Sequence, residues 1–418
     1  MIDKLILILL VLQVCVFNYF NISGQIIKII CILIVFSLFY GLAVSKRTLL
    51  KIGMLLPILL LCYLSYRVGN NRHFDIFMSN IRSIIYAALP LMFLSDLVVK
   101  DTRYVDSILL NSFWGINGYA ILNVIISVIQ VFHPGFMAGN SSWINTMPKD
   151  LICGTFGYSC TPQFGMFYLF VIFYNIYYVI RKPQRKWVKK YNIFIILYTI
   201  IISILNDNKA VYFELLLFII IYFSLNRNLN IKRKMRRRAI YPYLGLFLLM
   251  VFILVIYYVI PSFRELLNSN LLYAINLFLE ATRSESVFGY GSAERVYTII
   301  HAFTKYDAIR FGYGTGAYIW QAGTALGFTH FGLADLGSFL CLGGIWFTIF
   351  VLVFFLLCLI DITAINRDKI NQTIMFLILL ALFFYSQIIT SNTLCIILAC
   401  IMIMFGMLHR YSLLESEK

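Results

Sequence analysis

The side chains best suited to chemistry lie in one long interval of low hydrophobicity, residues 262–336. A guanidinium such as that of Arg295 binds phosphate groups through paired, charge-assisted hydrogen bonds. His330 and Asp335, near the end of the interval, are each able to take a proton from a hydroxyl group. The interval therefore combines a candidate anion-binding residue with two candidate general bases. The structural alternative for Arg295 is an interfacial arginine that extends to water beside Glu294.

Glycines in the motif FGYGTG add a second candidate element to this interval. Gly314 and Gly316 allow the backbone to turn with positive φ and to present N–H groups to an anion. The motif is not a Walker A loop, because no Lys-Ser or Lys-Thr pair follows it. The alternative reading is a plain turn between a helix and the next segment.

Two ionisable residues outside the interval accompany an apolar stretch that begins near residue 210. Lys209 offers a second positive charge for a diphosphate, and the alternative is an ion pair with the nearby Asp207. Glu214 lies about a turn and a half deeper, where a charged side chain costs free energy unless it has a partner or a wet cavity. We interpret Glu214 as a possible functional residue, with an interhelical hydrogen bond as the alternative.

The sequence contains no pattern typical of a metal or cofactor site. No group of histidines, cysteines and carboxylates has zinc-ligand spacing, and no paired carboxylates indicate a magnesium site. We therefore expect chemistry that needs neither metal nor cofactor. Cys153 and Cys160 share a loop and are close enough in sequence for a disulfide, which the sequence leaves open.

The composition predicts an all-α, polytopic membrane protein that forms a single integral membrane domain over residues 1–418. Hydrophobic residues make up 61% of the 418 residues and charged residues only 12%, which a water-soluble fold cannot hide in one core. Each spanning helix needs about 20 mostly apolar residues. The apolar runs predict about 12 spans, at residues 4–20, 26–44, 49–66, 81–99, 113–132, 163–180, 192–205, 210–226, 241–260, 337–360, 371–389 and 391–409.

The placement of the charges predicts the orientation of the chain in the membrane. The formal net charge is +16, and many of the cations lie in two loops without acids, at residues 181–190 and 227–238. Such loops are typical of the cytoplasmic side and of contact with anionic lipids, and they do not indicate nucleic-acid binding. An even number of spans then places both termini in the cytoplasm. It makes 262–336 an extracytoplasmic loop between the ninth and tenth spans.

This topology brings polar segments that are distant in sequence to one face of the membrane. The loop at 133–162, the turn LNDNKA at 205–210 and the interval 262–336 are all expected on the extracytoplasmic side. Within the interval, Val296, Ile299, Ile300 and Phe303 recur at helical spacing and predict an amphipathic surface helix that ends before FGYGTG.

Four segments together resemble the O-antigen polymerase and O-antigen ligase superfamily of bacterial membrane enzymes. The segments are GTFGYSCTPQFGMFYLF (154–170), NDNKAVYFELLLFIIIYF (206–223), SAERVYTIIHAFTKYDAIRFGYGTG (292–316) and LADLGSFLCLGGIW (333–346). They occur in the order of the family, and from the first to the last they span roughly half of the chain, residues 154–346. In the second segment, Lys209 stands where the family usually has an arginine, and a lysine acts as a point charge that cannot bind bidentately.

The resemblance implies residue roles and a location in the bacterial cytoplasmic membrane. Arg295 and Lys209 would hold the diphosphate of an undecaprenyl-diphosphate-linked glycan, and His330 would correspond to the base proposed for the ligase branch. The residues around Asp335 and Gly337 look more like the polymerase branch. Membrane lipids, a chain-length regulator and the flippase of the same pathway are the other partners it implies.

We therefore expect a metal-independent glycosyltransferase that polymerises lipid-linked oligosaccharide repeat units into a surface polysaccharide, such as O-antigen, capsule or exopolysaccharide. One alternative is a ligase that moves the glycan to another acceptor. The other is a flippase for the same lipid, a transporter class with a similar number of spans. Transporters tend to show related halves, and the absence of an evident internal repeat favours the enzyme.

Overall fold

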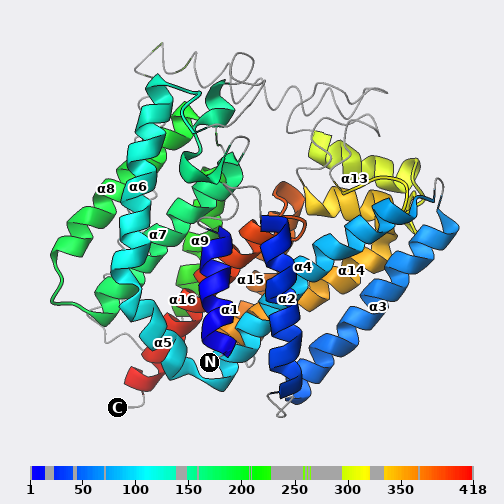
Figure 1. Cartoon of the computed structure of the whole chain (residues 1–418), viewed down its shortest axis with the longest axis horizontal. Helices are drawn as coiled ribbons and strands as arrows, with labels where there is room; N and C mark the ends of the chain where they lie inside the picture. Colours follow the sequence, from blue (N-terminus) through cyan, green and yellow to red (C-terminus); the bar gives the residue numbers. More distant parts are fainter. Residues whose placement is uncertain are drawn as a thin grey trace.

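A computed structural model gives the arrangement of the helices (Figure 1). The residues that it describes are 2–14, 23–40, 45–69, 72–137, 148–157, 160–206, 208, 210–226, 258, 261, 264, 294–320, 334–365 and 368–416. Every regular element within these residues is a helix. The predicted all-α class is therefore confirmed.

The helices follow the apolar runs of the sequence. They are α1 (Ile2–Leu12), α2 (Ser23–Tyr40), α3 (Lys46–Val68), α4 (Phe74–Lys100), α5 (Thr102–Asn111), α6 (Phe113–Phe132), α7 (Thr161–Arg181), α8 (Trp187–Leu205), α9 (Ala210–Asn226), α13 (Glu294–Thr304), α14 (Asp335–Thr363), α15 (Lys369–Tyr385) and α16 (Asn392–Ser416). The short 3-10 helices η3 (Pro148–Leu151) and η4 (Gly154–Phe156) precede α7. Among the described residues, seven helices are long and apolar enough to cross a membrane: α3, α4, α6, α7, α8, α14 and α16.

The predicted spans agree with these helices wherever the structure describes them. Each overlaps a helix except the one at 241–260, of which only Tyr258 is described. The count of about 12 spans stays a prediction, since α2, α9 and α15 are shorter apolar helices. The two termini lie at one end of the bundle and α13 lies at the opposite end (Figure 1).

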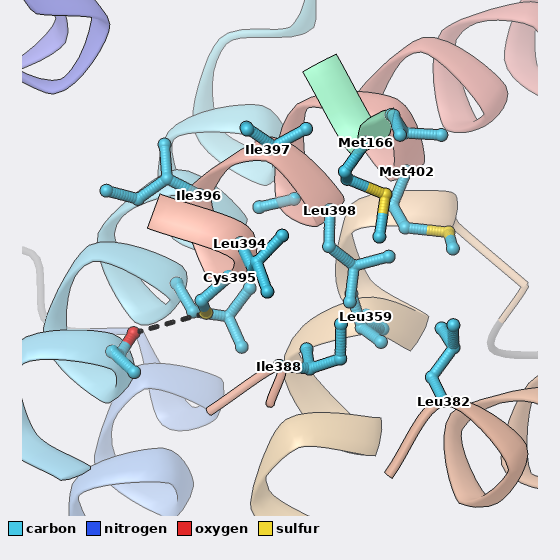
Figure 2. Close-up of a cluster of buried hydrophobic side chains, with 14 of the residues drawn as sticks. Met166, Leu359, Leu382, Ile388, Leu394, Cys395, Ile396, Ile397, Leu398 and Met402 are labelled. Carbon is cyan, nitrogen blue, oxygen red and sulfur yellow. Dashed lines mark hydrogen bonds between the residues drawn. The ribbon is translucent and has the colours of Figure 1, made fainter. Parts of the chain in front are cut away.

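The centre of the bundle is formed by α16, which is buried along most of its length. Its residues pack against side chains from α7, α14 and α15, and Figure 2 shows part of this core. The side chains labelled there are Met166, Leu359, Leu382, Ile388, Leu394, Cys395, Ile396, Ile397, Leu398 and Met402. Close packing rather than the hydrophobic effect holds such helices together in a lipid environment.

Helix α14 is broken at Gly344, which has φ +81° and ψ 175°. A Cβ atom there would lie 2.5 Å from the carbonyl oxygen of Arg310, so only glycine fits. The break leaves backbone groups of α14 without partners inside the helix. These groups form hydrogen bonds with residues just before FGYGTG and with residues of FGYGTG itself. Ile345 N donates to Ala308 O at 2.7 Å, and Tyr313 N donates to Cys341 O at 2.7 Å.

Side chains of α3 and α4 attach residues 308–320 to the bundle. Ser65 of α3 donates its hydroxyl to Phe311 O at 2.7 Å. Asn80 of α4 donates to Thr315 O and Tyr318 O, both at 2.8 Å. Because these two buried side chains supply the missing hydrogen bonds, the irregular backbone is tolerated between helices.

The end of the bundle that lies away from α13 contains a buried network of charged side chains. The ammonium group of Lys51 lies 2.7 Å from Asp96 and 3.0 Å from Asp361, and its side chain is only 2% exposed. Arg47 adds a second ion pair to Asp361 at 3.0 Å, and Ser95 accepts a hydrogen bond from Lys51 at 2.6 Å. The network joins α3, α4 and α14.

We predict that Lys51→Met lowers the free energy of unfolding by about 3 kcal/mol, because Asp96 and Asp361 lose the cation between them. The value is at the lower end for a broken buried pair, since the Asp96 side chain is 21% exposed. Thermal unfolding of the purified protein in detergent measures the loss.

Lys189→Met provides the control, because Lys189 is exposed on α8. The triple variant K51M/D96N/D361N should recover part of the stability, since it removes the two unpaired acids. Equal unfolding temperatures for K51M and K189M would contradict the structural role of the network.

Candidate functional site

Arg295 lies in the first turn of α13 with two of its nitrogen atoms available for bonding. The centre of its guanidinium group is 4.2 Å from the centroid of the Tyr385 ring, a cation–π geometry. Its Nε and Nη1 atoms are buried and have no hydrogen-bond partner among the residues that the structure describes. A buried donor without an acceptor is costly. Arg295 is therefore arranged to meet an acceptor that a bound anion would supply.

Helix α13 holds Arg295 in place through its buried face, which packs on the first turns of α14. The buried residues on this face are Glu294, Tyr297, Thr298, His301 and Ala302. The thiol of Cys341 in α14 donates to Thr298 O at 3.4 Å. Ile300 and Phe303 are each 41% exposed on the other side. The predicted helix before FGYGTG is confirmed.

Asp335 is the first residue of α14, and its buried carboxylate is fully engaged by hydrogen bonds. Ile389 N donates to Oδ2 at 2.5 Å, and the hydroxyl of Thr390 donates to Oδ1 at 2.7 Å. The backbone N–H of Asp335 donates to Ser386 O at 3.1 Å. These contacts attach the start of α14 to the link between α15 and α16. The geometry fits a positioning residue, and the predicted role of Asp335 as a base stays a prediction.

Glu214 lies near the start of α9 and is 0% exposed. Ser386 donates its hydroxyl to Oε1 at 3.3 Å. The other carboxylate oxygen, Oε2, has no hydrogen-bond partner in the described part of the chain. The ring of the preceding residue, Phe213, packs against the Tyr385 ring at a tilted angle, with the ring centroids 4.9 Å apart.

Three predicted residues from three different helices thus converge on one short segment, residues 385–390, which we term the junction. Arg295 contacts Tyr385, Glu214 contacts Ser386, and Asp335 binds the backbone and side chain of Thr390. The residues of the junction were not predicted from sequence, because they fell at the boundary between two apolar runs. The only sequence signal is the polar run SQIITSN within that boundary.

The glycines of FGYGTG serve chain packing in the structure. Gly314 has φ +114°, and its N–H donates to Leu342 O at 3.1 Å. A Cβ atom on Gly316 would lie 2.4 Å from the ring of Tyr66. The geometry therefore matches the alternative reading, a turn packed between helices, more closely than an anion cradle.

Lys209 and His330 lie outside the described residues, but the neighbours of Lys209 are in place. Asn206 donates to Ile152 O at 3.1 Å, and Asn208 donates to Thr161 O at 2.6 Å. The turn at 205–210 and the loop that precedes α7 are therefore in contact, as the topology predicted.

The loop before α7 is held by amide side chains of α6. Gln130 accepts hydrogen bonds from Gly154 N at 2.8 Å and from Cys153 N at 3.1 Å. Asn123 accepts one from Thr155 N at 2.8 Å. The GTFG part of the sequence is therefore a fixed element at the same end as the turn at 205–210.

Electrostatics at this end of the bundle favour a neutral histidine on α13. Burial lowers the pKa of His301, and the nearby Lys305 lowers it further. The imidazole is then neutral at physiological pH, the form that is able to accept a proton. Within the described part of the chain, no group of three or more His, Cys, Asp or Glu side chains is placed to hold a metal ion.

The site therefore consists of the junction and the residues of α9, α13 and α14 that contact it. Arg295 has donors and Glu214 an acceptor that find no partner among the residues described by the structure. Such a site suits a ligand with an anionic group, which would accept hydrogen bonds from Arg295, and a hydroxyl group, which would donate one to Glu214. Comparison of the chain with protein-family models, with curated proteins and with solved structures found no match.

Proposed function

We propose that the protein is a membrane glycosyltransferase that joins undecaprenyl-diphosphate-linked oligosaccharide units into a polysaccharide. The observation that carries the proposal is that two buried nitrogen atoms of Arg295, beside Tyr385, have no hydrogen-bond partner in the described part of the chain. The proposal also rests on the four segments that resemble the O-antigen polymerase and ligase superfamily. Three of them are linked by contacts between described residues. Asn208 of the second segment donates to Thr161 O of the first at 2.6 Å, and Tyr385 contacts both Arg295 of the third segment and Phe213 of the second.

The chemistry assigned to Arg295 is stabilisation of the leaving group. When the bond between the donor sugar and its diphosphate breaks, negative charge develops on the diphosphate. A fixed guanidinium in a site of low dielectric stabilises that charge without reorganising. Lys209 would add a second cation, because its neighbours Asn206 and Asn208 are fixed against the loop before α7.

Deprotonation of the acceptor hydroxyl is the second requirement of the reaction. His330 and Asp335 are the candidates from sequence. Asp335 supports the proposal chiefly as a positioning residue, because it joins α14, which packs on α13, to the junction. The acceptor would be the sugar of an incoming lipid-linked unit for a polymerase, and a different molecule for a ligase.

A flippase for the same lipid is the second candidate, and one structural feature favours it. Helix α14 is interrupted at Gly344, and interrupted helices are common at transporter binding sites. The interruption here is filled by residues 308–314, which leaves the enzyme as the better-supported reading. Loss of a flippase leaves lipid-linked units on the cytoplasmic face, whereas loss of a polymerase leaves them outside and unjoined.

We predict that Arg295→Ala abolishes polymer and leaves single repeat units on the outer face, because the leaving diphosphate loses its cation. Arg295→Lys should restore polymer only in part, since a lysine cannot reproduce the guanidinium contacts. Gel analysis of the glycans made by cells carrying each variant measures chain length.

Arg310→Ala is the matched control, because Arg310 is an exposed arginine shortly after α13. It should leave chain length unchanged. Normal chains in R295A would remove Arg295 from the mechanism, and long chains that remain unattached in R295A would assign the protein to the ligases instead.

We predict that Tyr385→Leu weakens binding of undecaprenyl diphosphate about tenfold, whereas Tyr385→Phe preserves it. The leucine removes the aromatic face that orients the guanidinium, an interaction of about 0.5–2 kcal/mol, and the phenylalanine keeps it. Binding to the purified protein in nanodiscs, measured by microscale thermophoresis, distinguishes the two variants. Equal affinities for the leucine and phenylalanine variants would show that the ring does not position Arg295.

A further inference from the structure

Two buried polar side chains of opposite character at the junction lack a partner within the described residues. Arg295 has unpaired donors at Nε and Nη1, and Glu214 has an unpaired acceptor at Oε2. Buried polar atoms in folded proteins are nearly always hydrogen-bonded, so each exception calls for a specific cause. A ligand that carries both an acceptor and a donor is one such cause.

Arg295 and Glu214 do not pair with each other, although Arg295 contacts Tyr385 and Glu214 contacts the next residue, Ser386. The ion pairs among the described residues include neither of them. Tyr385 instead contacts both the guanidinium group of Arg295 and the ring of Phe213, the residue before Glu214. The two side chains therefore contact consecutive residues of the junction, and the described part of the chain contains no direct ion pair between them.

Glu214 and Asp335 differ in a way that separates their roles. Each oxygen of Asp335 accepts at least one hydrogen bond from residues 389 and 390. Glu214 accepts a single hydrogen bond, from Ser386 to Oε1. Of the two buried carboxylates at the junction, Glu214 is the one with an oxygen, Oε2, that accepts no hydrogen bond from the described residues.

We propose that Glu214 is the general base of the site and accepts the proton of the acceptor sugar hydroxyl. This inference rests on the proposed glycosyltransferase function. The acceptor oxygen bonds to C1 of the donor sugar while its proton passes to Oε2 of Glu214. The bond between C1 and the phosphate oxygen breaks, and the diphosphate leaves with the electron pair beside Arg295. The proton is then released from Glu214 to water or to the departing diphosphate.

The burial of Glu214 fits this role because a glycosyltransferase must keep water away from its donor. A base that is 0% exposed does not activate bulk water, and hydrolysis of the donor is thereby suppressed. Because Oε2 is buried, the side chains around it must move for the acceptor hydroxyl to reach it. Ser386 is the positioning residue, because its hydrogen bond to Oε1 fixes the orientation of the carboxylate.

The decisive experiment compares Glu214→Gln with the wild-type protein in proteoliposomes. The substrate is the lipid-linked repeat unit extracted from cells that lack the protein, and the binding probe is undecaprenyl diphosphate. We expect E214Q to lower the rate of chain extension about 100-fold or more, while its affinity for undecaprenyl diphosphate stays within a fewfold of wild type. The glutamine keeps the shape and the hydrogen bond from Ser386 but cannot take the proton.

Glu214→Asp and Ser386→Ala distinguish catalysis from a structural role. E214D should retain measurable extension with a shifted pH–rate profile, and S386A should slow extension moderately with an unchanged thermal unfolding temperature. Extension by E214Q within threefold of wild type would overturn the assignment of Glu214. If R295A also extends normally in the same assay, the glycosyltransferase proposal fails as a whole. If only R295A is inactive, the function stands and the base lies elsewhere.

Discussion

Backbone groups that leave a helix inside a membrane protein must be hydrogen-bonded by the protein itself, because lipid offers no donors or acceptors. The irregular segments of this chain depend on that requirement. Asn80 and Ser65 bond residues 311–320, and Gln130 bonds the backbone at 153 and 154. Asp335 does the same for residues 389 and 390. In each case a buried polar side chain of a helix fixes a non-helical segment, and the candidate site is built on one of these.

Helix α14 carries this arrangement from one end of the bundle to the other. Asp335 at its start is bonded to the junction, and Asp361 near its end is paired with Lys51 and Arg47. Between them, the break at Gly344 receives residues 308–314. Because α13 also packs on the first part of α14, the position of Arg295 depends on a helix whose two ends are both held by carboxylates.

The sequence was informative where a residue type conflicts with its surroundings. Apolar runs predicted the helices. Glu214 stood out as an acid inside such a run, Asp335 as an acid next to one, and Arg295 as a cation in the long interval of low hydrophobicity, residues 262–336. All three meet at the junction. A single sequence has no such signal for the partners: Tyr385 and Ser386 are ordinary residues at the end of an apolar run. The meeting of Lys51 with Asp361 depends on helix packing between parts of the chain separated by most of its length.

The same reasoning explains why residue type alone did not divide the roles among the polar groups. The residue types of FGYGTG and of Asp335 are both common in binding sites. In the structure, however, the N–H of Gly314 and both carboxylate oxygens of Asp335 form hydrogen bonds within the protein. Glu214 and Arg295 differ because their remaining hydrogen-bonding capacity is unused by the described residues. A polar group whose hydrogen bonds are all made within the protein stabilises the fold. A polar group that is held in place with hydrogen-bonding capacity to spare is able to bind a substrate. By that criterion the proposed chemistry rests on Glu214 of α9 and Arg295 of α13, with α14 and the junction as their support.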